Sequence, residues 1–431
     1  MSEKKSLFKA FPGTFWLVIM MEFFERGSYY GMMSILSVYF TDQLNFTKES
    51  VGVIKSVIQP LLYILPILAG AIGDRFGYRR TLIFAFSFLG LGYFLTAQST
   101  EYTLVFASLV VMAIGAGSFK PMISGTIARV TNESNSTLGF GVFYWSVNLG
   151  AFLFPLILVP YLKNNFGWEY VIYAAAVGTA SMLIPTLFFY KEPPKQESKK
   201  NIPQVLKEMV MVVTDVKFIS LIVIYSGFWI LYFQMFDSVL WYVKDYVDAT
   251  ALNNSVNGFF SWFGINLNWA FDVEHVTVIN AGTIILLQMI VSNIVKKTAA
   301  LPTMITGISM GTVGMAILAI STDIWVFMLG TVIFSIGEMT AHPKFLSYVG
   351  LIAPPNKKAT YLGYAFLYGV IGSSIGGILG ANLYVHFVDN LKDPQTLWII
   401  FSLIGVATVI GLLIYSRIVK TGNQNESLRN N

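Results

Sequence analysis

The chain has 431 residues, of which 55% are apolar and only 12% are charged, against roughly 25% charged residues in an average soluble domain. A net charge of +5 would suggest nucleic-acid binding in a soluble protein, but here the positions of the charges matter more than their sum. The absence of cysteine excludes disulfides, thiolate metal sites and cysteine catalysis. This composition indicates a chain that is solvated by lipid.

The first apolar stretch follows residues 1–9, which we expect to be a cytoplasmic tail. It continues past Gly31 to Phe40, which is too long for the apolar core of a signal peptide. No short basic region with a small-residue cleavage site precedes it. We therefore expect a true membrane span here.

A membrane-spanning helix needs about 20 apolar residues. In the first half of the chain six segments meet this criterion: residues 13–40, 51–72, 81–98, 104–127, 138–160 and 168–190. The second half has six more: residues 218–242, 276–295, 300–320, 324–352, 360–386 and 395–416. The sequence therefore predicts an all-α integral membrane protein of about twelve transmembrane helices.

Residues 191–204, KEPPKQESKKNIPQ, are too polar and too rich in proline to span a membrane. We expect a six-helix bundle at residues 1–190, a cytoplasmic linker at 191–217 and a second six-helix bundle with a cytoplasmic tail at 218–431. Two six-helix halves in parallel repeat are the organisation of the major facilitator fold, in which substrate binds between the halves near the bilayer midplane. Among the short loops, residues 243–275 are an exception, and we expect this aromatic-rich external loop to pack against lipid headgroups or against helix ends.

The lysines and arginines predict the orientation. With the N-terminus inside, 20 of them lie in cytoplasmic segments, four lie outside and four lie within spans. Because cytoplasmic loops carry an excess of Lys and Arg, both termini are expected in the cytoplasm of a multi-pass protein of the cell membrane.

Several ionisable residues fall inside the predicted spans, where each costs about 2.5–3.5 kcal/mol on insertion scales and is by default a functional candidate. They are Glu22, Glu25, Arg26, Lys55, Lys120, Asp237, Glu338, His342 and Lys344. Glu22 and Arg26 are neighbours at i,i+4, and Glu25 points about 100° away, so that one carboxylate can satisfy Arg26 while the other reaches another helix. Lys120 is the partner that we expect there, either in a structural ion cluster or in a site that exchanges a proton or a substrate carboxylate for an internal ion pair.

Glu338 lies among apolar neighbours, and its carboxylate could bind the amine of a substrate. Alternatively, His342 or Lys344 on the same helix could pair with it. Asp237 lies toward the external end of its span, where we expect a solvated or helix-terminal role.

Residues 22–31, EFFERGSYYG, resemble the E-x-x-E-R-F-x-Y-Y-G signature of the proton-dependent oligopeptide transporters of the major facilitator superfamily, with only Gly27 departing. GDRFGYRR at 73–80 resembles the facilitator loop motif, FKP at 119–121 the fourth-span lysine motif and FYWSVNLG at 143–150 the F-Y-x-x-I-N-x-G signature. Trp229 with Gln234, Asn280, and Glu338 followed by Pro343 fit the same family. The resemblance covers nearly the whole chain.

The resemblance implies a proton-coupled symporter that imports di- and tripeptides by alternating access, a monomer with H⁺ as the coupling ion and without a cofactor, metal or nucleic-acid partner. Arg26 and Lys120 would bind the peptide carboxylate, Glu338 the amine, and Asn148 and Asn280 the backbone amides. Side-chain pockets would be lined by Tyr29, Tyr30, Tyr63 and Trp229. Protons would be taken by Glu22 or Glu25, with Arg26 and Lys120 as coupled cations and Glu338 as a second candidate.

The loop motif has a physical role of its own. Its acidic and basic residues can latch helix ends together on the cytoplasmic side and so stabilise one access state. The residues that we expect in this gating loop are Gly73, Asp74, Arg75, Arg79 and Arg80.

Three positions depart from the family. Carboxylates that many bacterial members carry in the seventh span are Tyr232 and Phe233 here, and a first-span arginine that would pair with one of them is Met33. This loss leaves open a transporter of the same fold for another small zwitterion or an organic anion. An enzyme is not expected, because the three histidines fall in different elements and neither H-E-x-x-H nor G-x-S-x-G occurs.

Overall fold

The computed structural model describes residues 10–133, 135–193 and 202–429. The predicted tail at 1–9 and part of the predicted linker lie outside these ranges. Nearly all of the described chain is helical, and it contains one isolated bridge, between Asp248 and Asp323. The elements from the N-terminus to the linker are α1 (Gly13–Met33), α2 (Leu36–Val38), the π-helix η2 (Tyr39–Gln43), α3 (Lys48–Phe76), α4 (Tyr78–Gln98), α5 (Tyr102–Val130), α6 (Ser136–Leu153), the π-helix η3 (Phe154–Leu158), α7 (Val159–Asn165), α8 (Trp168–Ser181), α9 (Leu183–Phe188) and α10 (Ile202–Val213).

The remaining elements follow α10. They are α11 (Val216–Gln234), α12 (Ser238–Tyr246), α13 (Thr250–Trp262), α14 (His275–Val295), α15 (Ala300–Leu318), α16 (Ile324–Ile352), the 3₁₀-helix η4 (Pro355–Lys357), α17 (Lys358–Tyr364), α18 (Leu367–Leu383), the π-helix η5 (Tyr384–Asn390) and α19 (Pro394–Arg429).

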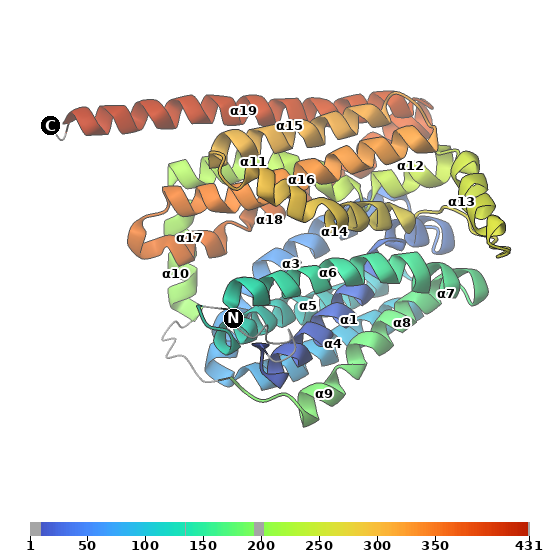
Figure 1. Cartoon of the computed structure of the whole chain (residues 1–431), viewed down its shortest axis with the longest axis horizontal. Coiled ribbons are helices and arrows are strands. Elements are labelled where there is room, and N and C mark those ends of the chain that lie inside the picture. The colour runs from blue at the N-terminus through green and yellow to red at the C-terminus, as the bar shows by residue number, and fades with distance from the viewer. Residues whose placement is uncertain (1–9, 134, 194–201, 430–431) are drawn as a thin grey trace, which may run out of the picture. The chain divides into compact units, whose positions relative to one another are not determined.

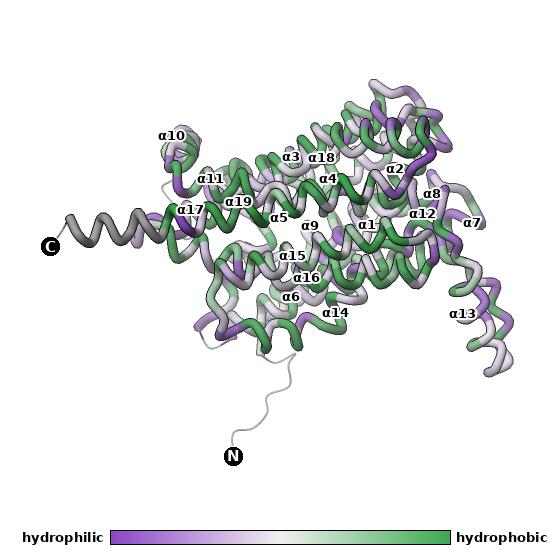
Figure 2. Tube along the Cα trace, turned by 90° about the horizontal axis from the view of Figure 1, so that it is seen from above, coloured by the Kyte–Doolittle hydropathy of each residue, from purple (hydrophilic) through white to green (hydrophobic). Residues whose placement is uncertain are grey.

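Eleven helices within the described residues are long and apolar enough to cross a membrane. They match the second to twelfth predicted spans. The first predicted span corresponds to α1, α2 and η2, and α1 is not among the eleven because Glu22, Glu25 and Arg26 lie together inside it. Figure 2 shows hydrophobic residues along the length of the helices.

The chain divides into two compact units, residues 1–46 with 57–207, and residues 47–56 with 208–431. In the first unit, α4 packs on α5 and α8, and α1 packs on α6 and α8. In the second unit, α15 packs on α16 and α19, and α11 packs on α18 (Figure 1). The first turns of α3 group with the second unit, and the predicted boundaries of the two six-helix halves stay a proposal.

The long external loop predicted at 243–275 contains a helix. Residues 250–262 form α13, which crosses the direction of the other helices of the second unit in Figure 1. Its sequence has too few apolar residues to indicate a span, and its asparagines and glycine made a loop the simpler prediction.

Candidate functional site

The first unit contains a buried ion cluster on α1. Arg26 Nε donates to Glu25 Oε2 at 2.5 Å, and Arg26 Nη2 donates to Glu25 Oε1 at 2.6 Å. This fork-to-fork pairing is the strongest geometry available to a guanidinium and a carboxylate. Arg26, Glu25 and Glu22 are all at most 5% exposed, so the cluster lies away from water.

Glu22 is only loosely held by the same arginine. Its Oε1 lies 3.8 Å from Arg26 Nε, and its buried Oε2 has no hydrogen-bond partner among the described residues. A buried carboxylate oxygen without a donor is costly unless a cation or a proton reaches it. Glu22 is therefore the under-satisfied member of the cluster.

Lys120 lies on α5 in the same unit, but the structure does not bring it into an ion pair. Its side chain is exposed, and it has no ion-pair partner among the described residues. Glu22 and Glu25 are near enough to interact with Lys120 electrostatically, but neither forms a direct ion pair with it. The expected pairing of Lys120 with a first-span carboxylate is absent here, and the lysine ammonium is available to another anion.

Aromatic and amide side chains surround these charges. The Arg26 guanidinium carbon lies 4.8 Å from the ring centroid of Tyr29 and 6.0 Å from that of Tyr30. The Tyr29 hydroxyl donates to Gln59 Oε1 at 3.2 Å, and Gln59 Nε2 lies 3.8 Å from Met33 Sδ. Met33, which stands where the family has an arginine, thus makes a neutral contact with Gln59.

Asn148 and Tyr63 are two further predicted residues of the first unit. Asn148 Nδ2 donates to the Tyr144 carbonyl at 2.9 Å along its own helix, so its amide donor is occupied. Tyr63 on α3 is half-buried.

In the second unit, Glu338 on α16 meets Asn280 on α14. Asn280 Nδ2 donates to Glu338 Oε2 at 3.1 Å and to Ser335 Oγ at 2.9 Å. Glu338 has no ion-pair partner among the residues that the structure describes. Of the alternative partners expected on α16, Lys344 donates instead to the Thr298 carbonyl at 2.7 Å.

The other alternative partner, His342, lies among rings. Its ring centroid is 5.5 Å from that of Trp229 and 5.7 Å from that of Tyr368. Trp229 also stacks on Tyr368 at 4.5 Å and contacts Tyr232 at 4.6 Å. The replacement of the seventh-span carboxylates has therefore extended an aromatic cluster.

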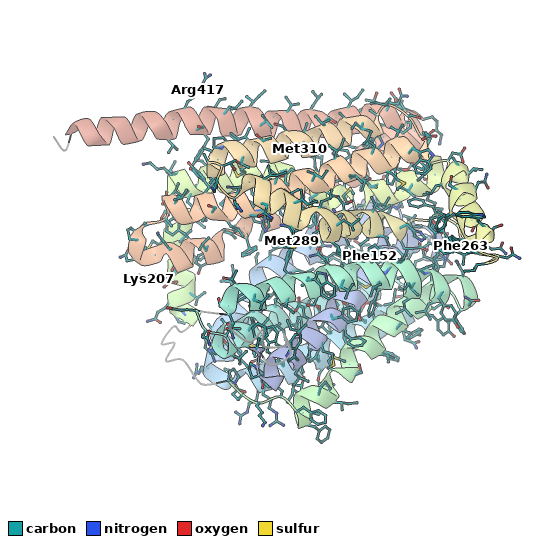
Figure 3. The ribbon with its side chains drawn as sticks, in the orientation of Figure 1. Phe152, Lys207, Phe263, Met289, Met310 and Arg417 are labelled. Carbon is teal, nitrogen blue, oxygen red and sulfur yellow. The ribbon has the colours of Figure 1, made fainter. Side chains whose placement is uncertain are left out.

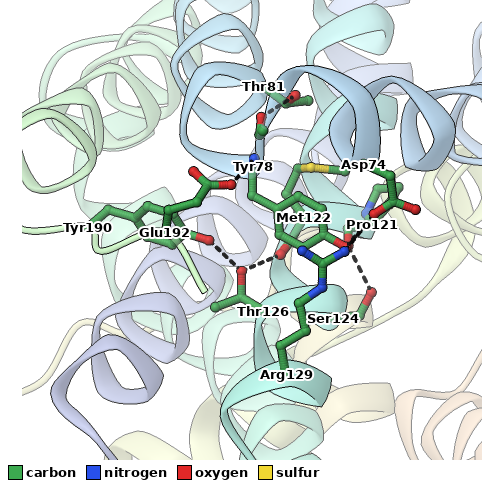
Figure 4. Close-up of polar contacts among 11 residues, drawn as sticks. Asp74, Tyr78, Thr81, Pro121, Met122, Ser124, Thr126, Arg129, Tyr190 and Glu192 are labelled. Atoms are coloured by element: carbon green, nitrogen blue, oxygen red, sulfur yellow. Dashed lines mark hydrogen bonds and ion pairs between the residues drawn. The ribbon is translucent and has the colours of Figure 1, made fainter. Parts of the chain in front are cut away.

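The predicted gating loop forms a network within the first unit (Figure 4). Arg129 Nη2 lies 2.6 Å from Asp74 Oδ1, and its guanidinium covers the Tyr78 ring with the Arg129 Cζ 4.0 Å from the centroid. The backbone N–H groups of Tyr78 and Arg79 donate to the Glu192 carboxylate at 2.6 and 2.9 Å, which satisfies free donors at the N-terminus of α4. The latch therefore includes two residues that the motif did not name, Arg129 and Glu192.

The other loop residues have different roles. Arg79 donates from its side chain to the carbonyls of Thr186 and Leu187 on α9. Arg75 and Arg80 are exposed, and neither pairs with Asp74. Gly73 is buried, and a Cβ there would displace the end of the Met122 side chain.

Sequence reasoning missed one buried ion pair. Lys55 Nζ on α3 lies 3.0 Å from Asp237 Oδ1, and the two side chains are 3% and 8% exposed. Of the two roles expected for Asp237, the solvated one is wrong, because its side chain is buried against Lys55 near the start of α3. The helix-terminal one is confirmed, because Asp237 is the N-cap residue of α12. No motif signalled this pairing, since 182 residues separate the partners.

Residues 16–270 match the Major Facilitator Superfamily. This match covers more than half of the chain, and the protein therefore belongs to that superfamily of membrane transporters. A relative from Salmonella typhimurium named dipeptide and tripeptide permease B is 24% identical over 467 residues, covering 92% of this chain and 93% of the relative. A relative of the same name from Aliivibrio fischeri is 34% identical over 183 residues, covering 42% of this chain and only 36% of the relative.

The fold has a solved counterpart. A POT family transporter in complex with 5-aminolevulinic acid has a TM-score of 0.77 at 21% identity, covering 96% of this chain and 98% of that chain. The predicted fold class, an all-helical major facilitator fold, is confirmed. The predicted resemblance to the peptide transporter family is confirmed as well, since the relatives carry peptide permease names.

Proposed function

We propose that this protein is a proton-coupled symporter that imports di- and tripeptides by alternating access. The observation that carries the proposal is a pair of charges without a direct ion pair among the described residues: an exposed Lys120 beside the Arg26 cluster, and a Glu338 whose partner is the neutral Asn280. A peptide zwitterion brings one charge of each sign. Its carboxylate binds Lys120 and Arg26, and its amine binds Glu338.

The neutral groups complete the recognition of a peptide. Asn148 and Asn280 bind backbone amides, while Tyr29, Tyr30, Tyr63 and Trp229 line the pockets for side chains. Rings with one polar end suit substrates whose side chains vary. The permease names of the two bacterial relatives support this substrate class.

Proton coupling is assigned to the α1 cluster. Protonation of Glu22 removes a charge that is costly to bury, because the buried Oε2 has no donor to stabilise it as a carboxylate. When Glu22 releases that proton, its carboxylate becomes negatively charged and competes with Glu25 for Arg26. Glu338 is the second candidate, since the Asn280 amide that donates to it carries no charge.

The distribution of Lys and Arg along the chain supports an orientation of the protein in the membrane. We place both termini in the cytoplasm and the protein, as a monomer with several spans, in the cell membrane. The Asp74–Arg129 and Glu192 contacts then form the cytoplasmic latch of one access state.

Uptake of labelled dialanine into proteoliposomes tests the proposal. Uptake should rise when the outside is acidified, should collapse with a protonophore and should be competed by a peptide panel. Absence of uptake with every peptide of the panel would exclude peptide transport.

A second candidate is a transporter of another small zwitterion or an organic anion. The observations that favour it are Tyr232, Phe233 and Met33 in place of charged family residues, together with the neighbour solved with 5-aminolevulinic acid. Competition of dialanine uptake by 5-aminolevulinic acid, and direct uptake of the labelled acid, distinguish the two.

A further inference from the structure

The segment between α12 and α14 has an unusual distribution of charge. Residues 249–271 contain no acidic or basic residue, whereas Lys244, Asp245 and Asp248 precede them and Asp272 and Glu274 follow. The hydroxyl and the backbone N–H of Thr250 hold the pKa of the Asp248 carboxyl below its usual value, so this end of the segment stays charged at neutral pH. The two ends of the segment are therefore suited to water and its middle is not.

The segment folds as a helical hairpin. Gly264 follows α13 with a φ of 77°, a left-handed conformation that favours glycine. The Ile265 N–H donates to the Phe260 carbonyl at 3.1 Å and the Gly264 N–H to the Ser261 carbonyl at 2.9 Å. These are the two bonds of a Schellman cap, and they turn the chain back along α13.

Two asparagines one turn apart on α13 hold the returning segment. Asn257 Oδ1 accepts from the Trp269 N–H at 2.9 Å, and Asn257 Nδ2 donates to the Trp269 carbonyl at 2.8 Å. Asn253 Oδ1 accepts from the Phe271 N–H at 2.8 Å. Backbone groups satisfied in this way can leave bulk water at lower cost.

The aromatic residues of the hairpin form two groups. Trp269 and Phe271 pack on His275 with ring centroids 4.9 and 5.4 Å away, and Phe271 reaches Phe327 of α16. At the tip, Phe263 contacts Phe259 and Trp262. The side chains of Phe259, Trp262 and Phe263 remain 57%, 82% and 61% exposed. The base of the hairpin is thus fixed to the second unit, and the tip projects from it.

We propose that this aromatic tip, formed by Phe259, Trp262, Phe263 and Ile265, inserts into the headgroup boundary of the bilayer and anchors the second unit there. The hairpin begins three residues after the span Val216–Tyr246 and ends just before the span His275–Val295, so both of its ends lie at the membrane boundary. Tryptophan and other amphipathic rings are enriched at that depth. A helix that presents apolar rings on one face and polar side chains on the other can lie in the interface plane.

Exposed apolar residues on the neighbouring span and the lack of charge in the hairpin favour lipid over a protein partner. The next span, α14, exposes Leu286 and Met289 at 75% and 77%. Figure 3 labels Met289 on α14 and Phe263 at the outer edge of the same unit. Neither α13 nor the return segment carries a charge with which a protein partner could be oriented.

Site-directed spin labelling can test where the tip lies. Because the sequence has no cysteine, each single-cysteine variant carries one label at a known position. We would label Trp262→Cys, Phe263→Cys and, on the return segment, Leu267→Cys, in the full-length protein in nanodiscs of phosphatidylcholine and phosphatidylglycerol. Collision with O₂, which concentrates in lipid, is compared with collision with the water-soluble complex NiEDDA. Glu101→Cys, an exposed position between α4 and α5, is the aqueous reference, and Leu286→Cys on α14 is the apolar reference.

We expect the O₂-to-NiEDDA collision ratio at Trp262 and Phe263 to exceed that at Glu101 several-fold and to approach that at Leu286. A ratio equal to that at Glu101 would place the tip in water and overturn the proposal. Low collision with both reagents would mean that protein covers the tip, which would overturn it too. Two labelled tip positions keep the test decisive if one variant fails to fold, and none of the outcomes depends on which solute is transported.

Discussion

Asn280 is the hydrogen-bond partner of Glu338, with Nδ2 3.1 Å from Oε2. The contact joins α14 to α16 within the second unit, and Ser335 accepts the other Nδ2 hydrogen at 2.9 Å. A neutral amide positions a carboxylate without cancelling its charge, because it supplies one donor and no net charge. Glu338 thereby keeps its capacity to bind a cationic group.

Glu338→Gln should abolish peptide uptake while leaving the fold intact. The amide can still accept from Asn280, but the charge that binds an amine is lost, and a charge-assisted hydrogen bond is worth about 1.5–3 kcal/mol, or roughly 10–150-fold in affinity. Uptake of labelled dialanine and the melting temperature in detergent check this. Glu101→Gln, which removes an exposed carboxylate elsewhere, is the matched control, and normal acid-stimulated uptake by Glu338→Gln would remove the assignment.

Lys120→Ala should weaken peptide binding and proton coupling together. Lys120 is exposed and has no direct ion-pair partner among the described residues, so its removal breaks no direct contact and should alter stability little. We expect the apparent affinity for dialanine to fall about tenfold, as for the loss of one charge-assisted contact. Competition assays and acidification of the liposome lumen measure the two effects, and Lys120→Arg, which keeps the charge, should retain part of each.

Arg129→Gln should lower the melting temperature by loosening the cytoplasmic network. The Asp74–Arg129 pair is short, at 2.6 Å, but Asp74 is 22% exposed, so water can replace part of the interaction. We expect a loss of about 1–3 kcal/mol, the cost of leaving a partly buried charged group unsatisfied. The double variant with Asp74→Asn should lose less than the sum of the single variants. Strict additivity in the melting curves would show that the two side chains do not interact.

Sequence reasoning located the spans because a run of 20 apolar residues is long enough to cross the hydrocarbon core and is rare in soluble proteins. It named Glu22, Glu25 and Arg26 correctly as neighbours, since helical spacing alone fixes which side chains lie close. It did not predict that Arg26 prefers the adjacent Glu25 to the i,i+4 Glu22, because side-chain rotamers decide that choice.

Contacts between segments far apart in the sequence could not be predicted from the sequence alone. The partner of the Tyr78 and Arg79 N–H groups, Glu192, lies 114 residues away from Tyr78 in the sequence, and it belongs to a stretch that was predicted only as a polar linker. The α13 hairpin was not predicted from the sequence for a different reason. Its asparagines indicate a loop by propensity, yet Asn253 and Asn257 use their side chains to bind the return segment.

The pairing of Lys55 with Asp237 gives the sharpest stability prediction. Both side chains are buried, their charged atoms are 3.0 Å apart, and Lys55 Nζ also lies 3.4 Å from the Phe236 carbonyl oxygen. Lys55→Met removes the cation beside the buried Asp237, and breaking a buried ion pair from one side typically costs about 3–5 kcal/mol. Lys55→Met with Asp237→Leu removes both charges and should regain most of that loss, because a well-packed apolar pair often matches a buried ion pair. Thermal unfolding followed by fluorescence size-exclusion would compare both single variants with the double variant. Should the single variants melt with the wild type, the pair contributes nothing to stability, and should the double variant melt below both, the charges are needed together.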